Sequence, residues 1–257
     1  MIEYKNVTVG FESNVVLNNV NLLIDRKSVI LGPNGSGKTT LIKATTGLYP
    51  YKGNIYVDGQ DVRNIKNYLP LSVNLGEVYS LGRKVKDIVY LYEEIKGLDK
   101  KTFESFLREV NLYDQVIDKP LYKLSAGQSL LTRTALALAS HPKIALLDEP
   151  FENLDPARRL TVVKWIKEYM KEGFITTHEL DLLKEFKDWS AYLLLNGKLH
   201  GPIIVEDLLE ASVVEGETSN ALVTVETPAG KKISLVKGQK GAKLSVLGSI
   251  DRIYTVV

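Results

Sequence analysis

Hydrophobic and polar positions alternate along the first thirty residues of the chain. The apolar residues fall at every second position over Val7 to Phe11, Val15 to Leu17 and Val20 to Ile24. Because successive side chains of a strand point to opposite faces, this period predicts antiparallel strands with one buried face. A further strand is predicted over Tyr51 to Val57, and the Asp58-Gly59 pair that follows favours a hairpin turn.

Further along the chain the pattern changes to a helical one. From Val85 to Tyr113 apolar residues recur three and four positions apart, which predicts a helical insertion that ends near Pro120. Leucine and alanine dominate Leu130 to Ala139, and this composition predicts another helix. Two compact apolar runs, Ile144 to Leu147 and Phe174 to Thr177, are typical of buried strands in a parallel sheet.

The last part of the chain, after Gly201-Pro202, has a pattern of its own. Val205 to Ala211 fits a short helix, and Glu215 to Ser219 reads as a polar linker. Four short strands are predicted, over Ala221 to Thr227, Lys231 to Val236, Lys243 to Leu247 and Arg252 to Val257. We therefore expect a main domain over residues 1–200 and a small β-rich accessory domain or dimer contact over residues 201–257, in which the sequence indicates no chemistry.

Composition and charge limit the possible functions. A chain of 257 residues can form one large domain with a small appendage. The formal net charge of +2 is too small to indicate nucleic acid as the main partner, and the lack of cysteine excludes disulfides and thiolate chemistry. The amino terminus lacks a signal-peptide layout and no apolar run is long enough to span a bilayer, so we expect a cytoplasmic protein.

The stretch GPNGSGKT, Gly32 to Thr39, is the first candidate binding site, a loop suited to phosphate groups. It fits the pattern G-x-x-x-x-G-K-[ST] and lies between an apolar run and a helical pattern. Its glycines let backbone N–H groups point at phosphates, and the following helix adds its positive end. Lys38 could reach the β- and γ-phosphates and Thr39 could ligate Mg²⁺. The residues expected to surround the nucleotide are Gly32, Pro33, Asn34, Gly35, Ser36, Gly37, Lys38, Thr39 and Thr40.

Two later stretches add to this picture. In LSAGQ, Ser125 precedes the leucine- and alanine-rich helix as a candidate N-cap, and Gly127 leaves room for something to approach the helix start. A simple helix cap is the alternative interpretation. Asp148 and Glu149 follow the apolar run at the strand end where α/β sheets bind ligands. Asp148 could hold Mg²⁺ while Glu149 polarises water. A turn and a helix from Ala157 to Met170 are predicted next.

These stretches occur in a characteristic order: the phosphate loop, LSAGQ, LLDEP, NLD and the strand-end His178. In this order they resemble the ATP-binding cassette ATPases, and from Met1 to about His200 the chain looks like the nucleotide-binding subunit of an ABC transporter. Each motif alone is weak to moderate evidence, whereas five in order are strong. The resemblance implies an α/β fold in which a P-loop NTPase core carries an antiparallel β subdomain and a helical insertion over about residues 80–140, with the β-rich appendage added.

The resemblance also implies how ATP is held. In ABC ATPases two chains enclose two ATP molecules head to tail, and the LSGGQ-type loop of one chain covers the ATP of the other. The residues matching that loop are Ser125, Ala126, Gly127 and Gln128. Ser125 and Gly127 would then bind the γ-phosphate of the partner's ATP, with the helix start serving as a second anion site.

Four more residues receive roles from the resemblance. Glu149 matches the general base and His178 matches the histidine that contacts the γ-phosphate. Asp155 matches the loop that communicates between subunits, and Phe11 matches the aromatic residue that stacks on adenine, although taken alone Phe11 fits a hydrophobic core equally well. Water would attack in line, with Lys38, Mg²⁺ and backbone donors stabilising the developing charge.

The sequence departs from the family pattern at three places. Ala126 replaces a glycine of the LSGGQ loop, and Ser129 to Thr132 replace an arginine-rich continuation, leaving Arg133. The third departure is the Q-loop, whose glutamine follows a strand in relatives. If Asn67 to Pro70 is that strand, the position holds Leu71. The candidates to substitute, if the loop is offset, are Ser72, Asn74 and Glu77.

Three functional hypotheses follow, in decreasing order of support. The first is a transporter ATPase at the cytoplasmic face of the cell membrane that recruits a membrane-spanning subunit and pairs as a homodimer or heterodimer, with metal-ion or vitamin import as a candidate role and no nucleic-acid partner. The second is a soluble ABC-type ATPase acting on nucleic acid or ribosomes. The third is a non-hydrolysing, ATP-dependent regulatory module, which only Leu71 supports.

Overall fold

The computed structural model describes residues 1–12, 14–66, 68–80, 83–227, 230–238 and 241–255. These residues form two compact units. The first unit contains Met1–Ile65 and Thr176–Val257, and the second unit contains Lys66–Ile175. The chain passes from the second unit back to the first within one strand. The two units follow a different division from the expected functional domains, 1–200 and 201–257, which stay a prediction.

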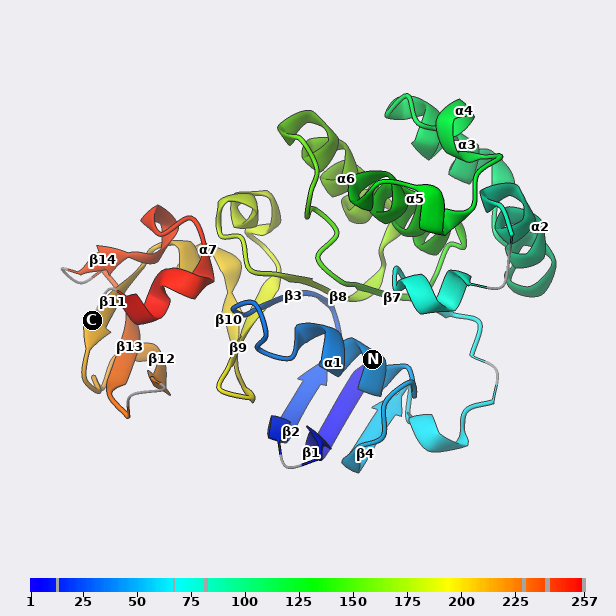
Figure 1. Cartoon of the computed structure of the whole chain (residues 1–257). Helices are drawn as coiled ribbons and strands as arrows, with labels where there is room; N and C mark the ends of the chain where they lie inside the picture. The colour runs from blue at the N-terminus through cyan, green and yellow to red at the C-terminus, as the bar shows by residue number, and fades with distance from the viewer. Residues whose placement is uncertain (13, 67, 81–82, 228–229, 239–240, 256–257) are drawn as a thin grey trace. The chain divides into compact units, whose positions relative to one another are not determined.

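An antiparallel sheet opens the first unit, drawn in blue in Figure 1. Its strands are β1 (Ile2–Phe11), β2 (Asn14–Ile24), β4 (Lys52–Val57) and β5 (Gln60–Asp61), in the order β2-β1-β4-β5. The alternating apolar residues Val7, Val9, Leu17 and Val20 are buried, as the period of two requires. The prediction of antiparallel strands and of a hairpin after Val57 is therefore confirmed.

A second group of strands in the first unit positions the phosphate loop. It comprises β3 (Lys27–Leu31), which pairs in parallel with β9 (Ser190–Leu195), and β10 (Lys198–Ile204), which pairs with β9 in antiparallel fashion. On the other side of β3 the backbone N–H of Gly32 donates to Thr177 O at 3.2 Å, at the end of β8 (Glu172–Thr177). Helix α1 (Lys38–Thr45) follows the loop.

The carboxyl-terminal part of the first unit is β-rich, as expected. After α7 (Val205–Leu209) come the strands β11 (Ala211–Glu215), β12 (Ala221–Glu226), β13 (Lys232–Lys237) and β14 (Ala242–Lys243), in the order β12-β13-β11-β14. Strand β11 was not predicted. The predicted strands over residues 243–247 and 252–257 are wrong, because short 3₁₀ helices η5 (Leu244–Val246) and η6 (Ile250–Thr255) form there. Ile250 and Ile253 are both fully buried, a spacing of three that suits one 3₁₀ turn. Residues 256–257 lie outside the described residues.

The second unit combines three parallel strands with the helical insertion. The strands are β6 (Leu71–Val73), β7 (Ile144–Leu147) and the first part of β8, in the order β6-β7-β8. The helices, green to cyan in Figure 1, are α2 (Val85–Lys96), α3 (Lys100–Glu109), α4 (Tyr113–Val116), α5 (Ala126–Ala139) and α6 (Pro156–Tyr169). The 3₁₀ helices of this unit are η2 (Gly76–Tyr79) and η3 (Leu121–Lys123). Two further 3₁₀ helices, η1 (Val62–Asn64) and η4 (Asp181–Phe186), belong to the first unit. The α/β fold class is confirmed.

One expected strand of the second unit is displaced. The strand predicted over residues 67–70 is wrong, and Asn67 lies outside the described residues. The strand begins at Leu71, because Leu69 is exposed whereas Ser72 and Val73 are buried and pair with β7. Leu71 is thus a strand residue, and Asn74 is the first residue after the strand.

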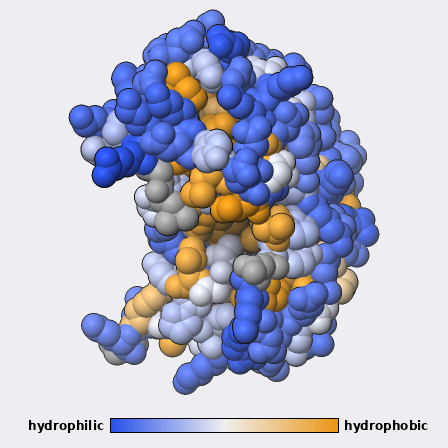
Figure 2. All heavy atoms as spheres, turned by 90° about the vertical axis from the view of Figure 1, so that its right-hand side faces the viewer, coloured by the Kyte–Doolittle hydropathy of each residue, from blue (hydrophilic) through white to orange (hydrophobic). Residues whose placement is uncertain are grey.

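Among the helices that the structure describes, none has the length and apolar character needed to cross a bilayer. Figure 2 shows one face of the molecule, on which hydrophilic residues predominate and hydrophobic residues form smaller areas. Five large apolar side chains among the described residues of the second unit are exposed, namely Leu69, Tyr90, Ile95, Tyr122 and Leu160. Tyr122 is 83% exposed, so it contributes little to the core of this unit.

Candidate functional site

The phosphate loop connects β3 to α1, and two of its glycines cannot be replaced without strain. A Cβ on Gly32 would lie 2.5 Å from Ser36 Oγ and 2.7 Å from Leu194 O. Gly37 has φ of 103°, and a Cβ there would lie 2.8 Å from Val16 Cγ1. At these two positions the loop passes so close to neighbouring protein atoms that only glycine fits.

The polar side chains of the loop turn inward. Lys38 is 5% exposed, and its Nζ donates to Gly32 O at 2.6 Å and Pro33 O at 3.0 Å. Ser36 Oγ is buried and has no hydrogen-bond partner among the described residues. A buried hydroxyl without a partner costs about 1–3 kcal/mol, which a phosphate oxygen would offset. The loop therefore fits a phosphate group chemically as well as in shape.

Helix α1 begins without a side chain that would neutralise its amino terminus. Gly37 is its N-cap, no side chain caps the backbone in the described structure, and the first turn contains no acidic residue. The first N–H groups of a helix have no intrahelical acceptor, so this end attracts an anion. Thr39 is exposed in the first turn, where its hydroxyl is accessible to a metal ion that accompanies a phosphate.

His178 lies on the same side of the first unit as the loop. It follows Thr177, whose carbonyl accepts from the N–H of Gly32, so the two strand ends are held side by side. His178 is half-buried, and its own carbonyl accepts from the backbone N–H of Ile250 at 2.9 Å. The structure thus brings together the phosphate loop and the histidine that the sequence singles out.

Phe11 ends β1 and is not a core residue. Its side chain is 42% exposed, and its ring contacts Tyr49 edge to face with centroids 5.0 Å apart. The Nζ of Lys43 lies 5.0 Å from the centroid of the Tyr49 ring. An exposed ring in this position is available for stacking, whereas the alternative core interpretation is wrong.

In the second unit, Asp148 and Glu149 directly follow β7. Both are half-buried, and Glu149 has φ of 41°, a left-handed conformation that is uncommon for a residue with a side chain. Such strained backbone often occurs at functional sites, where the surrounding structure must hold it in place. The backbone at the candidate base therefore holds an uncommon conformation that its surroundings must support.

Asn74 provides part of that support. Its Oδ1 accepts from the backbone N–H of Asp148 at 2.7 Å, and its Nδ2 donates to Asp148 O at 3.1 Å. Asn74 is 1% exposed, and its own carbonyl accepts from the guanidinium of Arg133 at 2.8 Å. One amide side chain therefore satisfies both backbone groups of the residue before Glu149. The sequence offers Asn74 only as a replacement for the Q-loop glutamine, and no local pattern indicates its pairing with Asp148.

The LSAGQ stretch forms a complete capping box at the start of α5. Ser125 Oγ accepts from the N–H of Gln128 at 3.3 Å, and Gln128 Oε1 accepts from the N–H of Ser125 at 3.2 Å. The expected N-cap is confirmed, and Ala126 is helical, so its methyl group introduces no backbone strain. A Cβ on Gly127 would lie 2.8 Å from Asn153 O, so that carbonyl fills the room left by the glycine.

Asp155 caps the next helix, α6. Its Oδ1 accepts from the N–H of Arg158 at 3.1 Å, and its Oδ2 lies 3.5 Å from Arg158 Nε. Ser125, Gly127 and Asp155 therefore all have structural roles within the second unit. Any contact that they make with a second subunit's nucleotide adds to these roles and stays a prediction.

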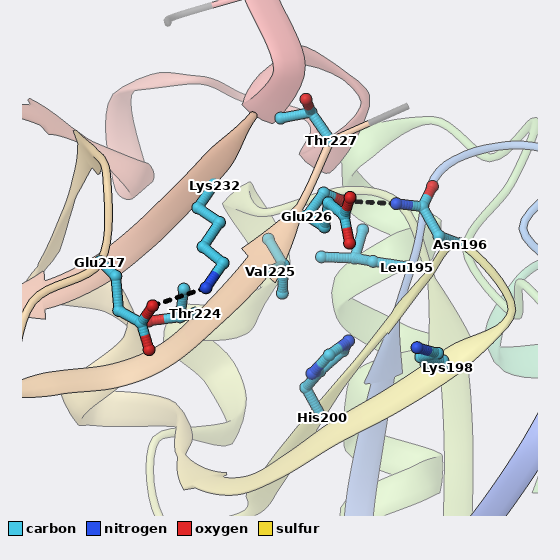
Figure 3. A pocket seen from close by; sticks show the side chains of 10 residues that line it. All are labelled: Leu195, Asn196, Lys198, His200, Glu217, Thr224, Val225, Glu226, Thr227 and Lys232. Carbon is cyan, nitrogen blue, oxygen red and sulfur yellow. Dashed lines mark hydrogen bonds and ion pairs between the residues drawn. The ribbon is translucent and has the colours of Figure 1, made fainter. Parts of the chain in front are cut away.

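A separate cavity of about 490 Å³ lies in the first unit, against the β9–β10 hairpin and strands β12 and β13 (Figure 3). Lys232 there donates to Glu217 at 2.6 Å, and Asn196 donates to the carbonyl of Glu226. Burial and the nearby ammonium of Lys198 lower the pKa of His200 below its usual value. None of the residues predicted for nucleotide binding lines this cavity.

Comparisons with known proteins agree with the motif order. Residues 17–152 match the family model described as ABC transporter. A protein of known structure, provisionally assigned as a cobalt transport ATP-binding protein, is 52% identical with full coverage of both chains and a TM-score of 0.94. A protein of Pyrococcus furiosus provisionally assigned as an ABC transporter ATP-binding protein is 35% identical over 77% of this chain and 82% of its own length. The manganese transport system ATP-binding protein of Bacillus subtilis is 29% identical over 78% of this chain and 86% of its own length.

Proposed function

The chain belongs to the ABC transporter family as an ATP-binding subunit whose ATPase activity is coupled to transport, and we propose that its transporter imports a transition-metal ion. The observation that carries this proposal is the 52% identity, over the full length of both chains, to a protein provisionally assigned to cobalt transport. The manganese transport relative supports the same class of cargo. The ATPase itself has no need to touch the ion, since it supplies the free energy.

For the nucleotide site, we propose that the phosphate loop and the start of α1 hold the phosphates of ATP. Lys38 would turn from the loop carbonyls toward the β- and γ-phosphates, and the buried Ser36 hydroxyl would gain its missing partner. Thr39 and Asp148 would supply hard oxygen ligands of the kind that Mg²⁺ prefers. The bound Mg²⁺ would neutralise phosphate charge, and Phe11 would stack on adenine.

Hydrolysis then depends on two further residues. Glu149 would accept a proton from the attacking water, and its backbone has an uncommon left-handed conformation that its surroundings must support. His178 contacts the γ-phosphate from the strand end beside the loop. The charge that develops in the transition state is stabilised by Lys38 and by the backbone N–H groups of the loop.

We also propose that two chains work head to tail, as a homodimer or a heterodimer. Ser125 and Ala126 are exposed at the start of α5, so a second subunit's ATP can reach this helix end. Ser125, Ala126, Gly127 and Gln128 would cover that ATP, and Asp155 would communicate between the subunits. The exposed apolar residues of the second unit, such as Leu69 and Tyr90, are candidates for contact with a membrane-spanning subunit, which would place the chain at the cytoplasmic face of the membrane.

Metal accumulation in cells tests this proposal. Cells that lack the chain would be complemented with wild type, with Glu149→Gln, or with Glu152→Gln, which removes an exposed carboxylate three residues away. Uptake of radiolabelled Co²⁺, Mn²⁺ and Fe³⁺ would be measured, with methionine uptake as a comparison. Wild type and Glu152→Gln should restore uptake of one metal, and Glu149→Gln should not. If the chain supports uptake of methionine but of none of the metals, the proposed cargo is wrong.

Purified protein provides the second test. With Mg²⁺ and ATP, Glu149→Gln should elute as a dimer and release phosphate about 10²- to 10⁴-fold more slowly than wild type, the usual effect of losing a general base. A variant that turns over at the wild-type rate would assign the base to another residue. A variant that binds ATP but remains monomeric would contradict the head-to-tail arrangement.

A further inference from the structure

The carboxyl-terminal segment Gly248 to Asp251 lies against the nucleotide site of the first unit. Its backbone pairs with the residues that follow His178, since Gly248 O accepts from the N–H of Leu180 at 3.0 Å. The N–H of Ile250 donates to His178 O, as described above. Ile250 is fully buried and anchors the segment in the unit. The segment is therefore a fixed part of the site's surroundings.

Asp251 places a carboxylate on the phosphate loop itself. Its Oδ1 accepts from the backbone N–H of Asn34 at 3.0 Å, and its Oδ2 accepts from the hydroxyl of Ser249. The same hydroxyl lies 3.2 Å from His178 O, within hydrogen-bond distance. Two residues of the tail thus touch both the loop and the histidine. This contact is formed between positions 217 residues apart, so no local sequence pattern could indicate it.

The carboxylate is charged at neutral pH. Burial tends to raise the pKa of Asp251, but hydrogen bonds from Ser249 and Asn34, the nearby His178 and its own backbone N–H together lower that pKa below its usual value. A carboxylate that accepts from a loop N–H resembles a phosphate oxygen in charge and in geometry. The carboxylate of Asp251 also repels the phosphates of an arriving nucleotide. Because Asp251 is half-buried, this repulsion is screened less than it would be in water.

We propose that Asp251 is a resident anion of the nucleotide site, one that lowers the affinity for ATP and couples the carboxyl-terminal segment to nucleotide binding. This inference rests on the site proposed above for residues 32–40. Coupling between two contacts is reciprocal: if Asp251 weakens ATP binding, bound ATP weakens the hold of Asp251 on the loop. The segment from Gly248 to Asp251 would then be held most firmly against the loop in the nucleotide-free protein, and less firmly when the nucleotide is bound.

The variant Asp251→Asn removes the charge of the side chain while keeping its shape. Asparagine keeps an oxygen that can accept from the N–H of Asn34 but removes the negative charge. Binding of a non-hydrolysable ATP analogue to the full chain, measured by calorimetry in low salt, should tighten about three- to tenfold. The gain should be smaller for ADP, which carries less charge, and should shrink in 1 M salt, where the screening length falls to about 3 Å.

The matched control is Asp188→Asn, which removes an exposed carboxylate of the same unit and should leave the affinity unchanged. Loss of binding in Lys38→Ala reports on the nucleotide site itself, whereas the ratio of wild-type to Asp251→Asn affinity reports on Asp251 alone. An affinity that is unchanged or weaker in Asp251→Asn, with wild type binding normally, would overturn the inference. It would show instead that the carboxylate only supports the loop.

Hydrogen exchange provides an independent readout. The N–H groups of Leu180 and Ile250, which pair with Gly248 O and His178 O, should exchange faster when the ATP analogue is bound to wild type. The change should be smaller in Asp251→Asn, and Ser249→Ala, which removes the hydroxyl that supports the carboxylate, should already exchange faster without nucleotide. Slower exchange on ATP binding would mean that nucleotide recruits the segment, and the proposal would be wrong.

Discussion

The two helices that begin at the predicted nucleotide motifs are built in opposite ways. Helix α1 starts at Gly37 with no side-chain cap and no acid in its first turn, below a loop in which Ser36 Oγ has no described partner. Helix α5 starts at Ser125 with a complete capping box. The first start leaves its polar groups open to an anion, whereas the second satisfies its own.

The same difference separates the surroundings of the two helices. Next to the loop, the polar contacts involve charged groups, namely the ammonium of Lys38 and the carboxylate of Asp251. In the second unit, Asn74 and Arg133 join the ends of β6 and β7 and α5 through hydrogen bonds to backbone. If the loop binds ATP as proposed, the contacts of Lys38 and Asp251 with the loop are those that ATP would replace, whereas Asn74 supports the backbone next to Glu149.

The largest expected effect comes from a substitution at the phosphate loop, where polar groups are open to an anion. Lys38→Ala should weaken ATP binding by about 100-fold, since a charged hydrogen bond contributes about 1.5–3 kcal/mol. The measurement is titration with ATP, together with the rise in thermal midpoint that ATP causes in wild type. Lys187→Ala, which removes an exposed lysine of the same unit, should bind ATP within a factor of two of wild type. Equal weakening in both variants would show that the effect comes from net charge.

The next effect is expected in the second unit, where the polar groups around Asn74 hydrogen-bond to one another. Asn74→Ala should lower the free energy of unfolding by about 2–4 kcal/mol, because two backbone groups of Asp148 lose their partner in a buried position. ATP turnover should fall as well, since Glu149 loses its support, while ATP binding at the loop should change little. Urea unfolding and phosphate release are the measurements. The exposed Asn64→Ala is the control, and an equal loss of stability there would contradict this explanation.

Ser125 tests whether a capped helix start can also bind an anion. Ser125→Ala should lower the free energy of unfolding by about 1 kcal/mol through loss of the N-cap. Ser125→Asp should keep the cap and the stability, but its charge should repel the phosphates of the partner's ATP and reduce turnover about tenfold or more. Turnover that follows stability in both variants would leave Ser125 as a cap alone.

The smallest effect concerns Lys96, whose Nζ donates to Leu71 O at 2.5 Å beside the second region. Burial lowers the pKa of Lys96 to about 8 from 10.5. Below about pH 8 the protonated ammonium therefore opposes folding, and this cost disappears as the pH rises toward 10.5. The stability of Lys96→Met relative to wild type should thus decrease by roughly 1 kcal/mol between pH 7 and about pH 9. A flat difference, like that expected for the exposed Lys100→Met, would contradict the burial of charge.

The sequence alone determined the elements whose periods are clear. The strands of the antiparallel sheet, the helical insertion, the capping serine and the phosphate loop all follow from local spacing and from residue types with few alternatives. The motif order also determined the family. These features depend on neighbours along the chain, so they can be predicted without knowing the fold.

Only the tertiary structure decided where polar groups meet over long distances. The apolar pattern of the carboxyl-terminal tail predicts strands, whereas the structure has 3₁₀ helices there. Ile250 and Ile253 are both buried against the rest of the first unit, and their spacing of three fits a 3₁₀ turn. The strand shift that makes Asn74 the first residue after β6, its pairing with Asp148, and the contact of Asp251 with Asn34 are all formed between distant segments. Their partners are brought together by packing, and no residue pattern on either side encodes that choice.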